Sequence, residues 1–234
     1  MTQSKYKIGE YKDMINVAID GPAGAGKSTI ARKAAAELGF IYVDTGALYR
    51  TVALNALRNG VENTKSAEEV IPTLKTAEVS LKFIDGEQHV FLRDEDVSTA
   101  IRQNEVSMAA SNVSSIPEVR TFLFDLQRNI AKNNDCIMDG RDIGTVVLPD
   151  AKIKIFLTAS PEARADRRFK ELQEKGQDVS YDVILKEIKE RDYQDMNRET
   201  APLKQAEDAV LVDTTEIGLE ESIQLMIGTI KERL

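Results

Sequence analysis

The chain has 234 residues, 42% of them hydrophobic, and a formal net charge of −8. This length suits one globular unit or a core with a large insertion, and the negative charge disfavours broad electrostatic attraction to nucleic acid or anionic membranes. No apolar run approaches membrane-spanning length, and the polar segment 1–13 is unlike a signal peptide. We therefore expect a cytoplasmic protein in which residues 1–13 form a flexible leader.

The chain has one cysteine and one histidine, which limits the chemistry open to it. Cys136 cannot form an internal disulfide, and its apolar neighbours predict a buried strand. His89 lies in an alternating segment without a plausible set of metal ligands around it. We expect neither a zinc site nor a catalytic triad built on histidine.

Residues 21–28 match the pattern G-x-x-x-x-G-K-[ST], one residue after the short apolar run 15–19. The glycines let consecutive backbone N–H groups turn around an anion where a helix begins, and residues 28–38 are predicted to form that helix. Lys27 is expected to reach the β- and γ-phosphates of a nucleotide. The predicted ATP-binding residues are Gly21, Pro22, Ala23, Gly24, Ala25, Gly26, Lys27, Ser28 and Thr29.

Five short apolar runs alternate with helical segments along the chain, at 15–19, 40–43, 136–138, 153–157 and 209–213. Such alternation predicts an α/β fold with a five-stranded parallel sheet wrapped by helices, and ligands beyond the carboxyl ends of the strands. The second run leads into a helix for which Thr45 is the predicted cap.

An antiparallel hairpin is predicted where residues 79–84 and 89–92 flank a turn at Asp85-Gly86. Residues 66–77 before it are predicted to form a weaker helix. A hairpin inside a βα pattern indicates an inserted subdomain at 62–103, which leaves 14–61 and 104–234 as the core. The charged segment 162–200 predicts two helices joined near Gly176.

A phosphate loop alone is compatible with a GTPase switch, an ATPase motor or a small-molecule kinase. The chain has no guanine-reading Asn-Lys-x-Asp segment, and its arginines near strand ends favour a second phosphorylated substrate. The hairpin and the Arg141-Asp142 pair argue against a kinase of another small acceptor, such as shikimate or gluconate. That alternative and a nucleotide-binding regulatory module both stay open.

Four ordered motifs, at 21–29, 43–50, 139–147 and 189–203, resemble those of bacterial cytidylate kinases. The resemblance runs from about Ile15 to the C-terminus. It implies a three-layer P-loop kinase core, a small mixed insert that binds the nucleoside monophosphate, and a short helical lid at about 160–195. It also implies that ATP phosphorylates CMP and dCMP with Mg²⁺. The implied partners are these nucleotides, without nucleic acid or membrane, and a monomer is the default expectation.

The resemblance also assigns roles on the acceptor side. Arg50 and Arg141 are expected at the CMP phosphate, and Arg191 and Asp195 at the sugar. A carboxylate with guanidinium donors complements the donor and acceptors of cytosine, whereas uracil presents an acceptor to the carboxylate. The implied substrate-binding residues are Thr45, Arg50, Ser111, Arg120, Arg141, Asp142, Arg191, Asp195 and Arg198.

Catalysis is expected to rest on neutralising the charge of the transferred group. Ser28 is the expected protein ligand of Mg²⁺, and Asp139 is expected to orient the ion through water. Arg164 and Arg168 fall in the expected lid, where pairing with neighbouring glutamates is the alternative role. The implied catalytic residues are Lys27, Asp139, Arg141, Arg164 and Arg168.

Overall fold

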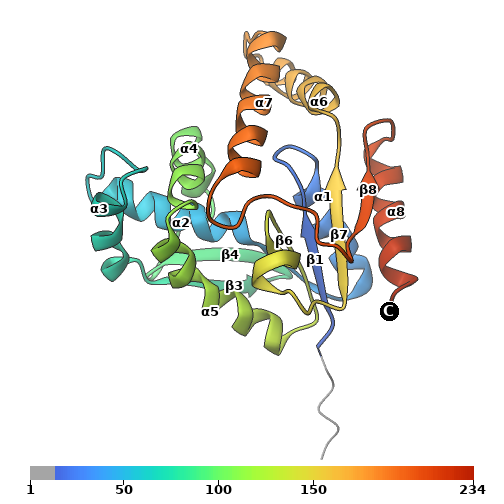
Figure 1. Ribbon diagram of the computed structural model, residues 1–234, viewed down its shortest axis with the longest axis horizontal. Helices are drawn as coiled ribbons and strands as arrows, with labels where there is room; N and C mark the ends of the chain where they lie inside the picture. Colours follow the sequence, from blue (N-terminus) through green and yellow to red (C-terminus); the bar gives the residue numbers. More distant parts are fainter. Residues whose placement is uncertain (1–13) are drawn as a thin grey trace, which may run out of the picture.

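The computed structural model describes residues 14–234 (Figure 1). The predicted leader, residues 1–13, lies outside the described residues. Within the described range, no helix has both the length and the apolar character needed to cross a membrane.

The core is a sheet of five parallel strands in the order β2-β6-β1-β7-β8. This confirms the predicted α/β fold, and each strand begins at the predicted residue or one residue later. The strands are β1 (Asn16–Asp20), β2 (Ile41–Asp44), β6 (Cys136–Gly140), β7 (Ile153–Thr158) and β8 (Val210–Asp213).

Alternating side chains of the buried strands pack on the two faces of the sheet, as the twofold period of a strand requires. Val17 and Ile19 face the apolar cluster formed with α1 (Lys27–Leu38) and α8 (Leu219–Lys231), which cover one face. Ala18 and Cys136 belong to the cluster on the other face, together with residues of α5 (Pro117–Asn133) and of the short π-helix η3 (Ile143–Val147). Cys136 is fully buried, as predicted.

A second, antiparallel sheet contains β3 (Val79–Ile84), β4 (Glu87–Leu92) and β5 (Glu95–Asp96). The predicted turn at Asp85-Gly86 is present, and both residues have positive φ, 52° and 80°, as a two-residue hairpin turn requires. The predicted weak helix at 66–77 is one α-helical turn, α3 (Ala67–Val70), followed by the 3₁₀-helix η1 (Ile71–Thr76).

One apolar cluster runs through the insert and continues beyond both of its expected ends. It joins α2 (Thr45–Arg58) and β4 to α4 (Asn104–Val113) and α5, through residues such as Leu48, Val90, Val106 and Leu123. The short 3₁₀-helix η2 (Ala100–Arg102) packs into the same cluster. The limits of a separate subdomain at 62–103 therefore stay a prediction.

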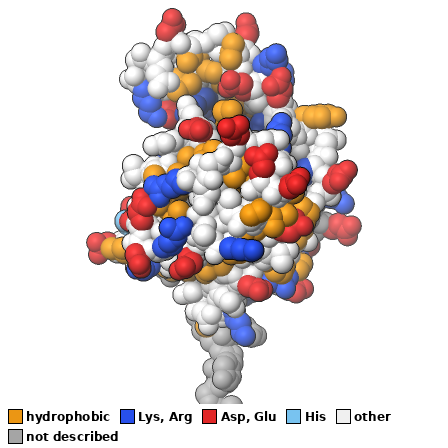
Figure 2. Space-filling model, turned by 90° about the vertical axis from the view of Figure 1, so that its left-hand side faces the viewer, with side chains coloured by type: hydrophobic (Ala, Val, Ile, Leu, Met, Phe, Trp, Pro, Cys, Tyr) orange, Lys and Arg blue, Asp and Glu red, His pale blue; other side chains and the backbone are white. Residues whose placement is uncertain are grey.

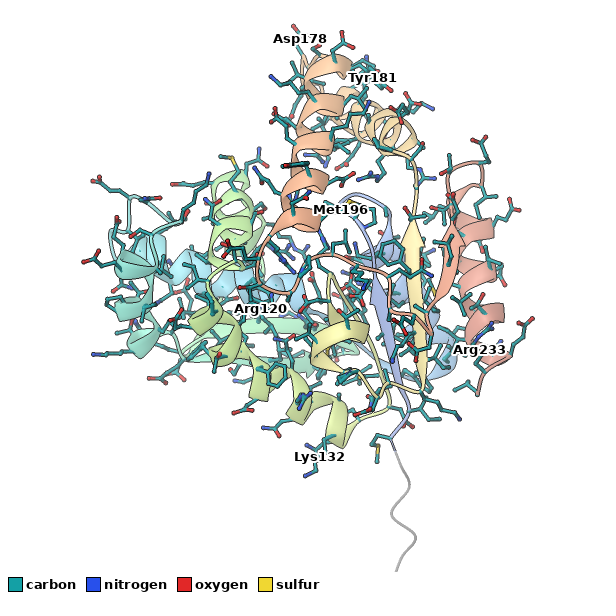
Figure 3. All side chains as sticks on the ribbon, in the orientation of Figure 1. Arg120, Lys132, Asp178, Tyr181, Met196 and Arg233 are labelled. Atoms are coloured by element: carbon teal, nitrogen blue, oxygen red, sulfur yellow. The ribbon has the colours of Figure 1, made fainter. Side chains whose placement is uncertain are left out.

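The predicted pair of charged helices is present as α6 (Pro161–Glu174) and α7 (Tyr181–Asn197). The two helices pack on each other through their own small apolar cluster, and the rings of Phe169 and Tyr181 meet edge to face at 6.1 Å. The pair stands out from the rest of the molecule (Figures 1 and 2). Asp178 and Tyr181 lie at its tip, far from the sheet (Figure 3).

The phosphate loop passes close to the sheet at Gly21. Its φ is +151°, and an added Cβ would lie 1.9 Å from the carbonyl oxygen of Leu157 in β7. We expect Gly21→Ala to lower the free energy of unfolding by about 2–4 kcal/mol, measured by urea denaturation, because backbone atoms cannot move aside easily. Gly228→Ala in α8 is the control, since it meets nothing within 4 Å. Equal stability of the two variants would contradict the expected clash.

Candidate active site

A cavity of about 430 Å³ lies at the carboxyl ends of β1, β2 and β6. It brings together residues predicted from motifs far apart in the chain. The predicted site residues that line it are Ala23, Gly24, Gly26, Lys27, Ser28, Thr29, Thr45, Arg50, Ser111, Arg120, Asp139, Arg141, Asp142, Arg191, Asp195 and Arg198. The predicted residues that do not line it are Gly21, Pro22, Ala25, Arg164 and Arg168.

The phosphate loop connects β1 to α1 and is shaped by glycines. Gly24 and Gly26 have φ values of 74° and 87°, which only glycine adopts readily. Gly26 also precedes α1 without a capping side chain, so the first N–H groups of the helix are available to an anion. This is the geometry of a phosphate cradle.

Lys27 is buried at the start of α1 and folds over the loop. Its Nζ donates to the carbonyl oxygens of Gly21 and Pro22, both at 2.8 Å. Burial, together with the nearby charge of Arg141, lowers the pKa of Lys27 to about 7. An anionic ligand in the loop would favour its charged form and supply a stronger acceptor than these two carbonyl groups.

Ser28 and Asp139 form a hydroxyl and carboxylate pair at the floor of the cavity. Ser28 Oγ donates to Asp139 Oδ2 at 2.9 Å, and the Tyr42 hydroxyl donates to Oδ1 at 3.1 Å. Burial, followed by repulsion from Asp44, raises the pKa of Asp139 to about 6.

Ser28 and Asp139 offer two oxygen atoms as ligands, which suits a Mg²⁺ ion that binds together with a nucleotide. Mg²⁺ keeps several waters and takes one or two protein oxygens when phosphates supply the other ligands. In the part of the chain that the structure describes, no three His, Cys, Asp or Glu side chains group so as to hold a metal by themselves. Both observations are consistent with a Mg²⁺ site in which the phosphates of a bound nucleotide supply further ligands.

The arginines of the cavity are oriented by carboxylates. Arg50 pairs with Asp44 at 2.8 Å, and Arg141 Nε donates to Asp195 at 2.8 Å. Burial alone would raise the pKa of Asp195, but Arg141, together with Arg191 and Arg198, outweighs this effect and the pKa is lowered. The buried Nε atoms of Arg50 and Arg191 have no hydrogen-bond partner among the described residues. Both arginines line the cavity, and guanidinium groups are suited to bind phosphate.

Asp142 forms the centre of a second polar group in the cavity. Its carboxylate accepts from Arg120 through Oδ2 and from Arg198 through Oδ1 at 3.3 Å. The Arg120 guanidinium also lies 5.8 Å from the centre of the Tyr49 ring. Arg120 reaches this point from α5, near the middle of the molecule (Figure 3). The arrangement offers both an acceptor and fixed donors to a planar polar ligand.

The two predicted lid arginines do not line the cavity. Arg164 is buried and donates from Nη1 to the carbonyl of Ala23 and to Asp192, both at 2.9 Å. Arg168 is exposed and pairs with Glu171 at 2.9 Å. Arg164 therefore ties α6 to α7 and to the phosphate loop. A role for either arginine at a transferring phosphate stays a prediction, and it requires a movement of the side chain or of α6.

The predicted cap of α2 was wrong by one residue. The carboxylate of Asp44 accepts from the N–H of Ala47 at 3.0 Å and caps the helix. Thr45 is the first helical residue, and its hydroxyl donates instead to the carbonyl of Asp139 at 2.7 Å. A carboxylate at the end of a strand directly before a helix was the signal available in the sequence.

Asp20 was missed by the sequence analysis although it shapes the site. This buried carboxylate accepts from the N–H groups of Ile143 and Gly144, both at 2.7 Å. Burial raises its pKa to about 6 despite these two hydrogen bonds. Asp20 thus fixes the backbone directly after Arg141 and Asp142. Its position between the first strand and the phosphate loop was the only signal in the sequence.

Comparisons with known proteins show the family to which the chain is similar. A profile of the family described as cytidylate kinase matches residues 17–232. A cytidylate kinase from Caldicellulosiruptor bescii is 53% identical over 213 residues, which cover 91% of this chain and 94% of that protein. A cytidylate kinase from Caldanaerobacter subterraneus is 50% identical over 218 residues, 93% of this chain and 95% of that protein.

A solved structure gives a more distant comparison. The crystal structure of an uncharacterized protein from Eubacterium ventriosum has a TM-score of 0.53 at 13% identity, and the alignment covers 94% of this chain and 100% of that chain. At this identity the likeness shows the fold alone. The family profile and the relatives decide the identity: the chain belongs to the cytidylate kinase family of enzymes.

Proposed function

We propose that the protein transfers the γ-phosphoryl group of ATP to CMP and dCMP, in the presence of Mg²⁺, to give ADP and CDP or dCDP. The observation that carries this proposal is that one cavity joins the phosphate loop to Asp142 and its two arginines. Arg50 and Arg141 line the same cavity. The relatives named cytidylate kinase support the same reaction.

On the donor side, the loop and Lys27 bind the phosphates of ATP. Lys27 Nζ exchanges the carbonyl groups of Gly21 and Pro22 for phosphate oxygens, which bind an ammonium group more strongly. Ser28 and Asp139 would hold Mg²⁺, which would supply positive charge that neutralises the phosphate oxygens.

On the acceptor side, Arg50 and Arg141 hold the phosphate of CMP, with Thr45 beside them. Asp142 accepts a hydrogen bond from the exocyclic amino group of cytosine, and Arg120 and Arg198 fix the orientation of this carboxylate. Ser111 completes the base site. Arg191 and Asp195 contact the sugar.

Phosphoryl transfer then needs alignment and charge neutralisation without a covalent intermediate. The helices α6 and α7 act as the lid that excludes water, and Arg164 or Arg168 reaches the transferring group when the lid closes. Because a single chain lines both sides of the cavity, we propose that a monomer is active. We place it in the cytoplasm, where ATP and nucleoside monophosphates are available.

The decisive experiment measures ADP release from ATP and Mg²⁺ with CMP, dCMP, UMP, AMP, GMP and shikimate at equal concentration. Rapid release with CMP and dCMP alone is the expected result. Release with another acceptor would keep the phosphate loop but overturn the substrate. Slow release that is indifferent to every acceptor would indicate a nucleotide-binding regulatory module.

Removing Arg141 should reduce turnover. We expect Arg141→Ala to lower kcat with CMP by at least about 100-fold, because a guanidinium that neutralises the phosphate and its developing charge is lost. Steady-state kinetics on protein shown to be folded by urea denaturation would measure this. Arg233→Ala, on the exposed C-terminal segment, should keep wild-type turnover. Near-normal kcat in folded Arg141→Ala protein would remove Arg141 from the mechanism.

Removing the carboxylate of Asp142 should weaken base selectivity. We expect Asp142→Ala to lower the ratio of kcat/KM for CMP over UMP by at least about tenfold, because the acceptor for the cytosine amino group is lost. Asp142→Asn keeps the volume of the side chain and a partner for Arg120, so it separates selectivity from folding. An unchanged ratio in both folded variants would refute the assignment of Asp142.

A further inference from the structure

The edge of the parallel sheet is contacted by a side chain from the inserted hairpin. β2 is one of the two edge strands of the five, so one side of its backbone has no neighbouring strand in the sheet. At the last residue of β2, the N–H of Asp44 donates to Gln88 Oε1 at 2.8 Å, and Gln88 Nε2 donates to the carbonyl of Asp44 at 3.3 Å. The two residues are 44 positions apart in the chain.

The carboxamide of Gln88 takes the place of a peptide group from an adjacent strand. It offers one acceptor and one donor to the N–H and C=O of the same residue, which is what a paired strand would supply. Gln88 is the second residue of β4, directly after the tight turn at Asp85 and Gly86. The turn and the register of Phe83 opposite Gln88 therefore fix where this side chain projects.

Asp44 in turn orients an arginine of the cavity. Its Oδ2 binds Arg50 Nη2 at 2.8 Å, while its Oδ1 caps α2 at the N–H of Ala47. The backbone of Asp44 is thus held by Gln88 and its side chain holds Arg50. A shift of Asp44 would move the Arg50 guanidinium and the first turn of α2 together.

We propose that Gln88 is a positioning residue for the acceptor phosphate, acting through Asp44 on Arg50. This inference rests on the proposed function, in which Arg50 binds the phosphate of CMP. Gln88 ties the tip of the inserted hairpin to the core at the one residue that orients this arginine. Both hydrogen bonds of Gln88 go to the backbone of Asp44, whereas the phosphate loop lies before α1, so we expect the main effect of Gln88 on the acceptor side.

The test compares Gln88→Leu with Glu87→Ala. Leucine keeps the approximate volume of glutamine and removes both hydrogen bonds, whereas Glu87 is the exposed neighbour in the same strand. We expect Gln88→Leu to raise KM for CMP about five- to tenfold, with kcat and KM for ATP within about twofold of wild type. Glu87→Ala should match wild type in all three parameters.

Two further measurements separate positioning from simple structural support. Gln88→Leu should change kcat/KM for CMP much less in an Arg50→Ala background than in wild type, because its effect passes through Arg50. Hydrogen exchange of the segment 41–46, without nucleotide, should be faster in Gln88→Leu than in Glu87→Ala, because the Asp44 amide loses its acceptor.

The outcomes are distinct. Absence of CMP-dependent turnover in wild type overturns the proposed function. CMP-dependent turnover with an unchanged KM for CMP in Gln88→Leu overturns this inference alone. A raised KM that persists in full with Arg50→Ala, or that is matched by an equal rise in KM for ATP, also overturns it, since Gln88 would then support the fold generally.

Discussion

The site is assembled around one buried carboxylate, Asp139, at the carboxyl end of β6. Its side chain accepts from Ser28 at the start of α1 and from Tyr42 in β2, and its backbone carbonyl accepts from Thr45 at the start of α2. One residue therefore joins the helix that follows the phosphate loop to the helix that carries Arg50. Because burial raises the pKa of Asp139 to about 6, its charge at neutral pH depends on the donors and cations around it.

A second constraint is the pairing of the cavity's arginines with carboxylates of the same chain. Arg50 is held by Asp44 and Arg141 by Asp195, so both guanidinium groups are oriented by the protein itself. Partly buried ion pairs are a weak source of stability, because removing the charges from water offsets much of their attraction. Their contribution here is direction, because each pairing sets the orientation of a guanidinium group that lines the cavity.

The insert and the α6–α7 pair are each packed around an apolar cluster. The insert shares an apolar cluster with α2, α4 and α5, and α6 and α7 share a smaller one of their own. Each part also contacts a residue that lines the cavity through hydrogen bonds, Gln88 with Asp44 and Arg164 with Ala23. A hydrogen bond contributes less net stability than the burial of a large apolar side chain, so the apolar clusters are the main source of stability in both parts.

Local patterns in the sequence determined much of the fold and many of the residues that line the cavity. The five strands, the turn at Asp85-Gly86 and the loop from Gly21 to Ser28 were predictable, because each depends on residues close together in the chain. The motif resemblance also named most of the charged residues that line the cavity.

Other features were decided by the tertiary structure alone. The support that Asp20 gives to Ile143, the burial of Arg164 against Asp192 and the contact of Gln88 with Asp44 all join segments that lie far apart in the chain, and no local spacing specifies that they meet. A carboxylate, guanidinium or carboxamide can satisfy its hydrogen bonds with many partners, and only the packed sheet and its flanking helices select one.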